Sequence, residues 1–276
     1  MPSSSSHALI GGLVGAALAA ASNDFDAIIF SAPADPWYKS AGVLWKVIVP
    51  MVSSPVLGFA AGFLLMGVLF AIISGMAAGG GPLARMARPR WVNSFFGKAQ
   101  LASAGYMGFA HGMNDAQKTM GIIALALVAA QADGTLDDLP GFLAFLHPSR
   151  EALADGDIDL WIKLTCAVVM AAGTAAGGWR IIKTLGHKLV KLHPIHGFAA
   201  EASAASVITL ASSLGIPVST THNISSAIMG VGTAKRFNAI RWTVVEKMIW
   251  AWILTIPMAG GVAYGLFRLI EALGWA

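Results

Sequence analysis

The sequence predicts an all-α integral membrane protein, and its composition and its apolar segments both point there. The 276-residue chain is 56% hydrophobic and only 12% charged, whereas soluble domains carry about 25% charged residues. Several apolar segments approach or exceed the roughly 20 residues that cross a bilayer as a helix. Because lipid cannot hydrogen bond to a peptide backbone, such segments are expected to be helical.

Four apolar segments are expected to span the bilayer, at about residues 43–76, 101–130, 160–178 and 242–273. Two other segments are too short or too interrupted to span. The first, residues 1–22, contains an apolar run of less than the required length. The second, residues 197–234, is broken near its centre at Gly215 and Pro217. We expect the second segment to be a re-entrant helical hairpin, and the first to be half of one.

The charged residues suggest an orientation for these segments. Lysine and arginine concentrate in residues 77–98, 180–191 and 235–241, and aspartate concentrates in residues 24–35 and 133–159. The positive-inside rule places the three basic segments in the cytoplasm. The hairpin then enters from the cytoplasmic side, and residues 1–22 lie on the opposite side. A net charge of +4 is too small to indicate a nucleic-acid partner, so the expected environment is the lipid bilayer.

The two short segments share one pattern, which we interpret as an internal repeat; the alternative is a chance resemblance between segments rich in small residues. Residues 2–15 match residues 217–230 without a gap, and a hydroxyl is kept at two further positions. Copies on opposite sides of a membrane form an inverted repeat, the architecture of many secondary transporters. We therefore divide the sequence into residues 1–96, the remainder of a first repeat, and residues 97–276, the second. The identical pairs are Pro2 and Pro217, Ser4 and Ser219, His7 and His222, and Gly15 and Gly230.

A helix that begins at each hairpin tip is expected to bind an anion. Its first N–H groups have no intrahelical partner, and its dipole is positive at that end. The hydroxyls at the two tips add donors; an alternative is that they only cap the helices. His7 and His222 recur at one repeat position and are expected to make structural hydrogen bonds beside the tips. The hydroxyls belong to Ser5, Ser6, Ser219, Thr220 and Thr221.

Polar residues inside the segment 101–130 indicate a second group of site residues, because ionisable groups in a membrane helix are costly. Asn114, Asp115, Gln117 and Lys118 lie there. Asp115 could hold Na⁺ or a proton, face a divalent metal that accompanies the anion, or accept a hydrogen bond from a protonated oxygen of the anion. An internal Asp115–Lys118 pair is the structural alternative. His111 and Asp115 supply only two metal ligands, which do not make a site.

Glu201 is a further candidate for proton or cation coupling, and the alternative is a solvated residue near a helix start. The lone cysteine, Cys166, lies in an apolar run and is expected to fill a packing position. An intramembrane hydrolase is a competing class, since serine, histidine and aspartate are available for it. The sequence has no Gly-x-Ser-x-Gly elbow and no His-Glu-x-x-His motif, which disfavours this class. We expect a protein that is not an enzyme and needs no cofactor.

Residues 110–118, Ala-His-Gly-Met-Asn-Asp-Ala-Gln-Lys, and residues 217–222, Pro-Val-Ser-Thr-Thr-His, resemble the two signatures of the inorganic phosphate transporter (PiT) family. Residues 3–7 resemble its first-repeat hairpin signature. The resemblance implies a low-affinity phosphate symporter of the cytoplasmic membrane, driven by H⁺ or Na⁺, whose substrate could be a metal–phosphate complex. It also implies that Asn114 and Asp115 line the substrate and cation site, and that Ser5, Ser6, Thr220 and Thr221 hold phosphate.

The sequence departs from this family at its start. The family has a first-repeat counterpart of the Asn114–Asp115 motif upstream of the first hairpin signature, whereas only Met1 precedes Pro2 here. By the repeat's own spacing, we expect on the order of one hundred residues of the first repeat to be missing. Alternatives are a homo-oligomer that completes the site, a permease for sulfate or another tetrahedral oxyanion, or an inactive membrane fragment.

Overall fold

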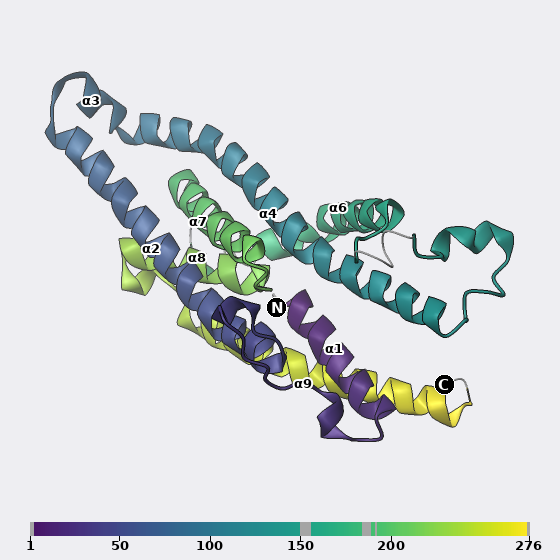
Figure 1. Cartoon of the computed structure of the whole chain (residues 1–276). Coiled ribbons are helices and arrows are strands. Elements are labelled where there is room, and N and C mark those ends of the chain that lie inside the picture. The colour runs from purple at the N-terminus through teal and green to yellow at the C-terminus, as the bar shows by residue number, and fades with distance from the viewer. Residues whose placement is uncertain (1–2, 150–155, 184–188, 191, 275–276) are drawn as a thin grey trace. The chain divides into compact units, whose positions relative to one another are not determined.

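The computed structural model describes residues 3–149, 156–183, 189–190 and 192–274, and these residues contain no β-strand (Figure 1). The predicted all-α class is confirmed. The helices of eight or more residues are α1 (Ser5–Ala20), α2 (Val49–Ala78), α4 (Pro89–Ala132), α6 (Leu160–Lys183), α7 (Pro194–Ser213), α8 (Thr220–Lys235) and α9 (Trp242–Ala272).

The helices belong to two compact units. The first unit comprises Met1–His111 and Arg180–Ala276, and the second comprises Gly112–Trp179. The long helix α4 contributes residues to both units. The first unit contains α1, α2, α7, α8 and α9, and the second contains the end of α4 and nearly all of α6. The two hairpin-like segments can therefore be compared within one unit.

Among the described residues, three helices are long and apolar enough to cross a membrane: Leu44–Ala78, Leu160–Gly178 and Trp242–Ala272. They agree with three of the four predicted spans. The first of them includes a π-helical segment, Leu44–Ile48, directly before α2. The fourth predicted span, 101–130, is helical as part of α4. Its own polar residues, Asn114 to Lys118, lower its hydropathy below that of the other three.

Residues 77–98, the first of the three basic segments, are mostly helical. A short helix, α3 (Gly81–Met86), is followed by α4, which already begins at Pro89. Both helices carry proline in their first turn, where the ring fixes a helical φ and the missing N–H costs nothing. Positive charge in this segment is therefore compatible with helical structure, and its cytoplasmic location stays a prediction.

Residues 197–234 form two helices, as predicted, with the break where glycine and proline occur. α7 ends at Ser213, Gly215 adopts a left-handed φ of +67°, and α8 starts at Thr220. Glycine suits this turn because it has no Cβ to clash at positive φ. α7 begins at Pro194, slightly earlier than predicted. The two helices pack against each other and against α2.

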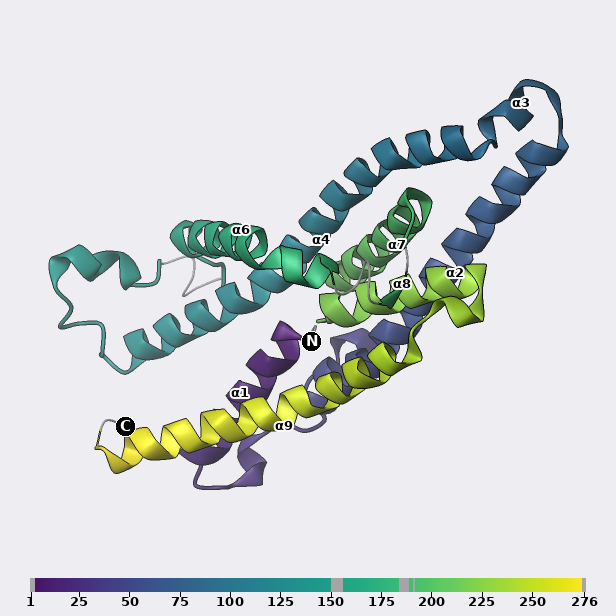
Figure 2. The ribbon, with the colours of Figure 1, turned by 180° about the vertical axis from the view of Figure 1, so that it is seen from behind.

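The half-helices α1 and α8 pack in the same way on two different long helices. α1 lies along α9, and α8 lies along α2 (Figures 1 and 2). A glycine allows close approach in each pair: a Cβ at Gly15 would overlap the carbonyl oxygen of Gly260, and a Cβ at Gly230 would overlap that of Phe59. Gly15 and Gly230 are partners in the sequence repeat, so the repeat extends to the packing.

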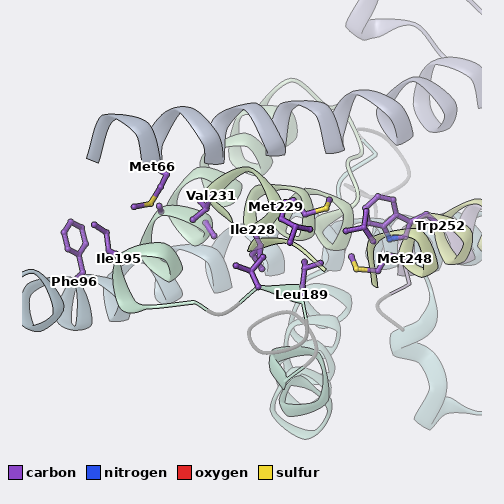
Figure 3. Packing of buried hydrophobic residues seen from close by; sticks show 14 residues of the cluster. Met66, Phe96, Leu189, Ile195, Ile228, Met229, Val231, Met248 and Trp252 are labelled. Atoms are coloured by element: carbon purple, nitrogen blue, oxygen red, sulfur yellow. The ribbon is translucent and has the colours of Figure 1, made fainter. Parts of the chain in front are cut away.

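The main apolar cluster of the first unit surrounds α8. Met66 of α2, Val231 of α8 and Met248 of α9 are fully buried, and Ile228 and Trp252 pack with them (Figure 3). Burial of such side chains stabilises the fold by about 1.5–3 kcal/mol each. This cluster holds α8 in place behind its N-terminus. In the second unit, Cys166 is a buried free thiol, in agreement with its predicted packing role.

Candidate functional site

The helices α1 and α8 begin with the same geometry. Each has 16 residues and a serine N-cap in extended conformation, with φ and ψ of −91° and 115° at Ser4 and −84° and 112° at Ser219. The Ser4 hydroxyl accepts a hydrogen bond from the His7 N–H at 3.2 Å, and the Ser219 hydroxyl accepts one from the His222 N–H at 3.2 Å. The capping alternative therefore holds for Ser219, while its hydroxyl proton can still be donated elsewhere.

The two capped N-termini meet. The rings of His7 and His222 contact edge to face, with centroids 4.6 Å apart, and His222 also stacks on Trp252 at 4.1 Å. In Figures 1 and 2 the start of α1 lies beside the turn from which α8 starts. The positive ends of two helix dipoles are thus directed to one region, which favours an anion there. The sequence predicted both tips but not the contact between their histidines.

The predicted hydroxyls differ in exposure. Ser6, Ser219 and Thr220 are buried, Thr221 is half-buried, and Ser5 is exposed. Of the two copies, α8 therefore has the more enclosed first turn. Ser5 keeps its predicted role only if a ligand or another part of the protein reaches it.

Further buried polar groups follow in α8, and sequence reasoning did not single them out. Asn223, Ser225 and Ser226 are at most 1% exposed. Their side chains, and both ring nitrogens of His222, have no hydrogen-bond partner among the described residues. Burying polar groups in this way costs free energy. The sequence signal that could have revealed them is the presence of these three polar residues in the first two turns of α8.

Asn114 and Asp115 lie in the second unit and are buried on α4. Asp115 Oδ1 accepts a hydrogen bond from Asn114 Nδ2 at 3.0 Å and forms an ion pair with Lys118 Nζ at 3.3 Å. The internal pair considered as an alternative is therefore present. Gln117 of the same segment is exposed. The pair compensates two charges in a membrane helix, where an isolated charge would be costly.

Glu201 of α7 is half-buried rather than solvated. Its Oε2 accepts a short hydrogen bond of 2.6 Å from Ser103 Oγ of α4, and the side chain of Gln100 also bonds to it. Ser103 itself is 4% exposed. The carboxyl group is thus held by two side chains that sequence reasoning missed, because they lie about one hundred residues away in the sequence. Its predicted coupling role remains a prediction.

His111 is half-buried in α4. Among the described residues, no group of three or more His, Cys, Asp and Glu side chains is arranged to hold a metal ion. His111 and Asp115 therefore gain no third ligand of these types from the described part of the protein. These side chains alone do not fit a resident metal.

Comparison with known proteins assigns the protein to a family. The family model "Phosphate transporter family" (PHO4) matches residues 1–263. A "Probable low-affinity inorganic phosphate transporter" of Bacillus subtilis is 35% identical over 273 residues, covering 98% of this chain and 69% of the relative. Proteins of the same name from Mycobacterium tuberculosis (strain H37Rv) and Rhizobium meliloti are 38% and 40% identical; the sequence covers 56% and 65% of their lengths.

One solved structure, "The sodium-dependent phosphate transporter", has the same fold. It superposes with a TM-score of 0.67 at 21% sequence identity, and the match covers 98% of this chain and 74% of the solved one. The protein thus spans between 56% and 74% of the lengths of these four proteins. Its relatives are named as transporters rather than enzymes, in agreement with the sequence motifs. These findings show that the chain is a multi-pass membrane protein that belongs to the phosphate transporter family.

Proposed function

We propose that this protein carries inorganic phosphate across the cytoplasmic membrane as a low-affinity symporter. The observation that carries the proposal is the convergence of two capped helix N-termini at the contact between His7 and His222. A single helix N-terminus attracts an anion weakly, whereas two that face one region add their N–H donors and their dipoles. A divalent oxyanion suits such a pair because it has acceptor oxygens on all sides.

The first turns supply the proposed phosphate ligands. In each helix the serine cap uses the N–H of the third residue, His7 or His222, so the N–H groups of the first two residues lie outside the helical ladder. These two residues are Ser5 and Ser6 in α1, and Thr220 and Thr221 in α8. Each position therefore combines a backbone donor with a hydroxyl. Neutral donors of this kind bind an anion without the desolvation cost of a buried cation.

Following the motif resemblance, we assign cation coupling to Asp115 and a further substrate contact to Asn114. Glu201, an ionisable residue of the hairpin, is a second candidate for coupling. In its present contact, Asp115 is neutralised by Lys118. A proton or Na⁺ that binds Asp115 would weaken this pair, so cation binding and the position of Lys118 are linked. Sodium appears in the name of the solved neighbour. For the present protein, a proton, Na⁺ and a co-transported divalent metal are alternatives to be separated by experiment.

Uptake of labelled phosphate tests the proposal directly. The protein would be expressed in bacteria that lack their own phosphate transporters, with its amount in the membrane measured for every variant. We expect uptake above background, strongly reduced by Thr221→Val and by Asp115→Asn. Thr119→Ala is the matched control for Asp115, because this nearby polar side chain is exposed and lies outside the 110–118 signature. Its uptake should equal that of the wild type.

Three further arms define the substrate and the coupling ion. Excess unlabelled sulfate should leave phosphate uptake unchanged. If sulfate competes as well as unlabelled phosphate does, the substrate is a tetrahedral oxyanion in general and not phosphate in particular. Removal of Na⁺, addition of a protonophore, and addition of a metal chelator distinguish the three coupling alternatives. A wild-type protein that inserts into the membrane without any uptake would contradict phosphate transport by this sequence, and the inactive-fragment alternative would then stand.

A further inference from the structure

Lys46 makes a long-range contact to the tip of the α7–α8 hairpin. Its Nζ donates to the carbonyl oxygen of Gly215 at 3.2 Å and to that of Tyr38 at 3.0 Å. Lys46 lies in the π-helical segment before α2, inside a candidate membrane span. A charged side chain in such a position is costly unless it is paired or bound to carbonyl groups. Here one ammonium group joins its own segment to a turn 169 residues further along the sequence.

The Gly215 end of this contact is the turn that positions α8. The Gly215 N–H bonds to Ser212 and the Ile216 N–H bonds to Ala211, which closes the end of α7. Only four residues separate Gly215 from the first residue of α8, Thr220. A cation is also favourable at the carbonyl end of a helix, where the dipole is negative. Lys46 therefore holds the turn from which the proposed phosphate-binding helix starts.

The Tyr38 end of the contact is itself fixed. The connection between α1 and α2 contains an antiparallel bridge between Ala32 and Ala41. The buried hydroxyl group of Ser40 accepts a hydrogen bond from the Ala34 N–H and donates one to the Ala34 carbonyl oxygen. Lys46 thus links the hairpin tip to a structured connection and not to a freely moving loop, so its contact can fix the position of the tip.

We infer that Lys46 is a positioning residue of the phosphate site: its bond to Gly215 holds the N-terminus of α8 where the first-turn donors reach the substrate. This inference rests on the proposed phosphate transport for its effect on affinity. The bond itself is a charge-assisted hydrogen bond at an exposed position, so solvent reduces its strength below that of a buried bond of this class. Its loss should weaken phosphate binding without removing any ligand of the phosphate.

Transport kinetics test the consequence for the substrate. Lys46→Met, which keeps most of the length of the side chain and removes its charge, should raise the KM for phosphate about threefold to fivefold, as expected for the loss of one exposed charge-assisted hydrogen bond, with a smaller change in maximal rate. Lys46→Arg should recover most of the affinity, because it restores a donor. Lys39→Met is the matched control: it removes an exposed lysine from the same connection and should leave KM unchanged. A normal KM in Lys46→Met would overturn the inference.

Amide hydrogen exchange in lipid nanodiscs tests the tether without any transport. In Lys46→Met the amides of Gly215 and Ile216 should exchange at least several times faster, whereas those of α1 should not change. Lys39→Met should exchange like the wild type. Unchanged exchange at the hairpin turn would overturn the inference whatever the uptake. Faster exchange in a protein that transports no phosphate would contradict the proposed function and leave the tether in place.

Discussion

Gly15→Ala should destabilise the protein, because α1 has no room for a methyl group where it crosses α9. A Cβ at Gly15 would overlap the carbonyl oxygen of Gly260 and would lie 2.7 Å from both its carbonyl carbon and its Cα. All three are backbone atoms, so a side-chain rotation cannot relieve the clash. At Gly12, one turn away, the added Cβ would instead meet Ala263 Cβ at 3.9 Å, which is ordinary contact.

Gly15→Ala and Gly12→Ala share one stabilising contribution, and only Gly15→Ala has a destabilising one. Alanine stabilises a helix relative to glycine by about 0.8–1.0 kcal/mol, and this gain applies to both. Overpacking against a fixed partner costs about 1–3 kcal/mol and occasionally more, and this cost applies only to Gly15. We therefore expect Gly15→Ala to be less stable than Gly12→Ala by about 1–3 kcal/mol, with Gly12→Ala at or slightly above the wild type.

The assay is thermal unfolding of both purified variants in one detergent, together with the denaturant midpoint where unfolding is reversible. Gly230→Ala, the repeat partner, should behave like Gly15→Ala, because its Cβ would overlap the backbone of Phe59. Equal stability of Gly15→Ala and Gly12→Ala would refute the reasoning, since it would mean that α1 and α9 do not approach as closely as described.

Two further predictions concern local interactions. Ser4→Ala and Ser219→Ala should each lower stability by about 1 kcal/mol, because each removes the side-chain acceptor of a helix N-cap; chemical denaturation measures the loss, and a variant as stable as the wild type would contradict the cap. Lys118→Met should destabilise by several kcal/mol because it leaves the buried Asp115 carboxylate without its cation. The double variant with Asp115→Asn should recover much of this stability in the same assay. If it recovers none, the ion pair between Asp115 and Lys118 does not stabilise the protein.

The positions of most helices could be predicted because hydrophobic length and helix-breaking residues are local signals. Gly215 and Pro217 marked the hairpin turn, and the apolar run after His7 marked a helix too short to span. The start of α4 at Pro89 could not be predicted in this way, because its first turns are basic and resemble a solvated loop. Proline is common both at the first position of a helix and in loops, so Pro89 by itself does not indicate which of the two follows.

Polar residues that interrupt apolar segments, such as Asn114 and Asp115, could be singled out from the sequence, and their role in a site stays a prediction. The candidate site was not predictable where a residue acts through a distant contact. Lys46 is a single lysine at the start of a span, and Ser103 is one of many small residues in α4; only the fold brings them to Gly215 and Glu201. The sequence repeat predicted two similar half-helices, and the prediction that their topologies are inverted stays a prediction.

The repeated glycines explain how two polar helix ends can meet inside the protein. Gly15 follows His7 by two turns, and Gly230 follows His222 by the same interval, which is about 12 Å along a helix. Each half-helix is therefore pressed against a long helix at the same distance behind its N-terminus. Because backbone contacts of this kind yield little, they fix the axial position of both N-termini. A larger residue at either glycine would displace one helix end from the other, so the contact between His7 and His222 depends on packing well away from the histidines themselves.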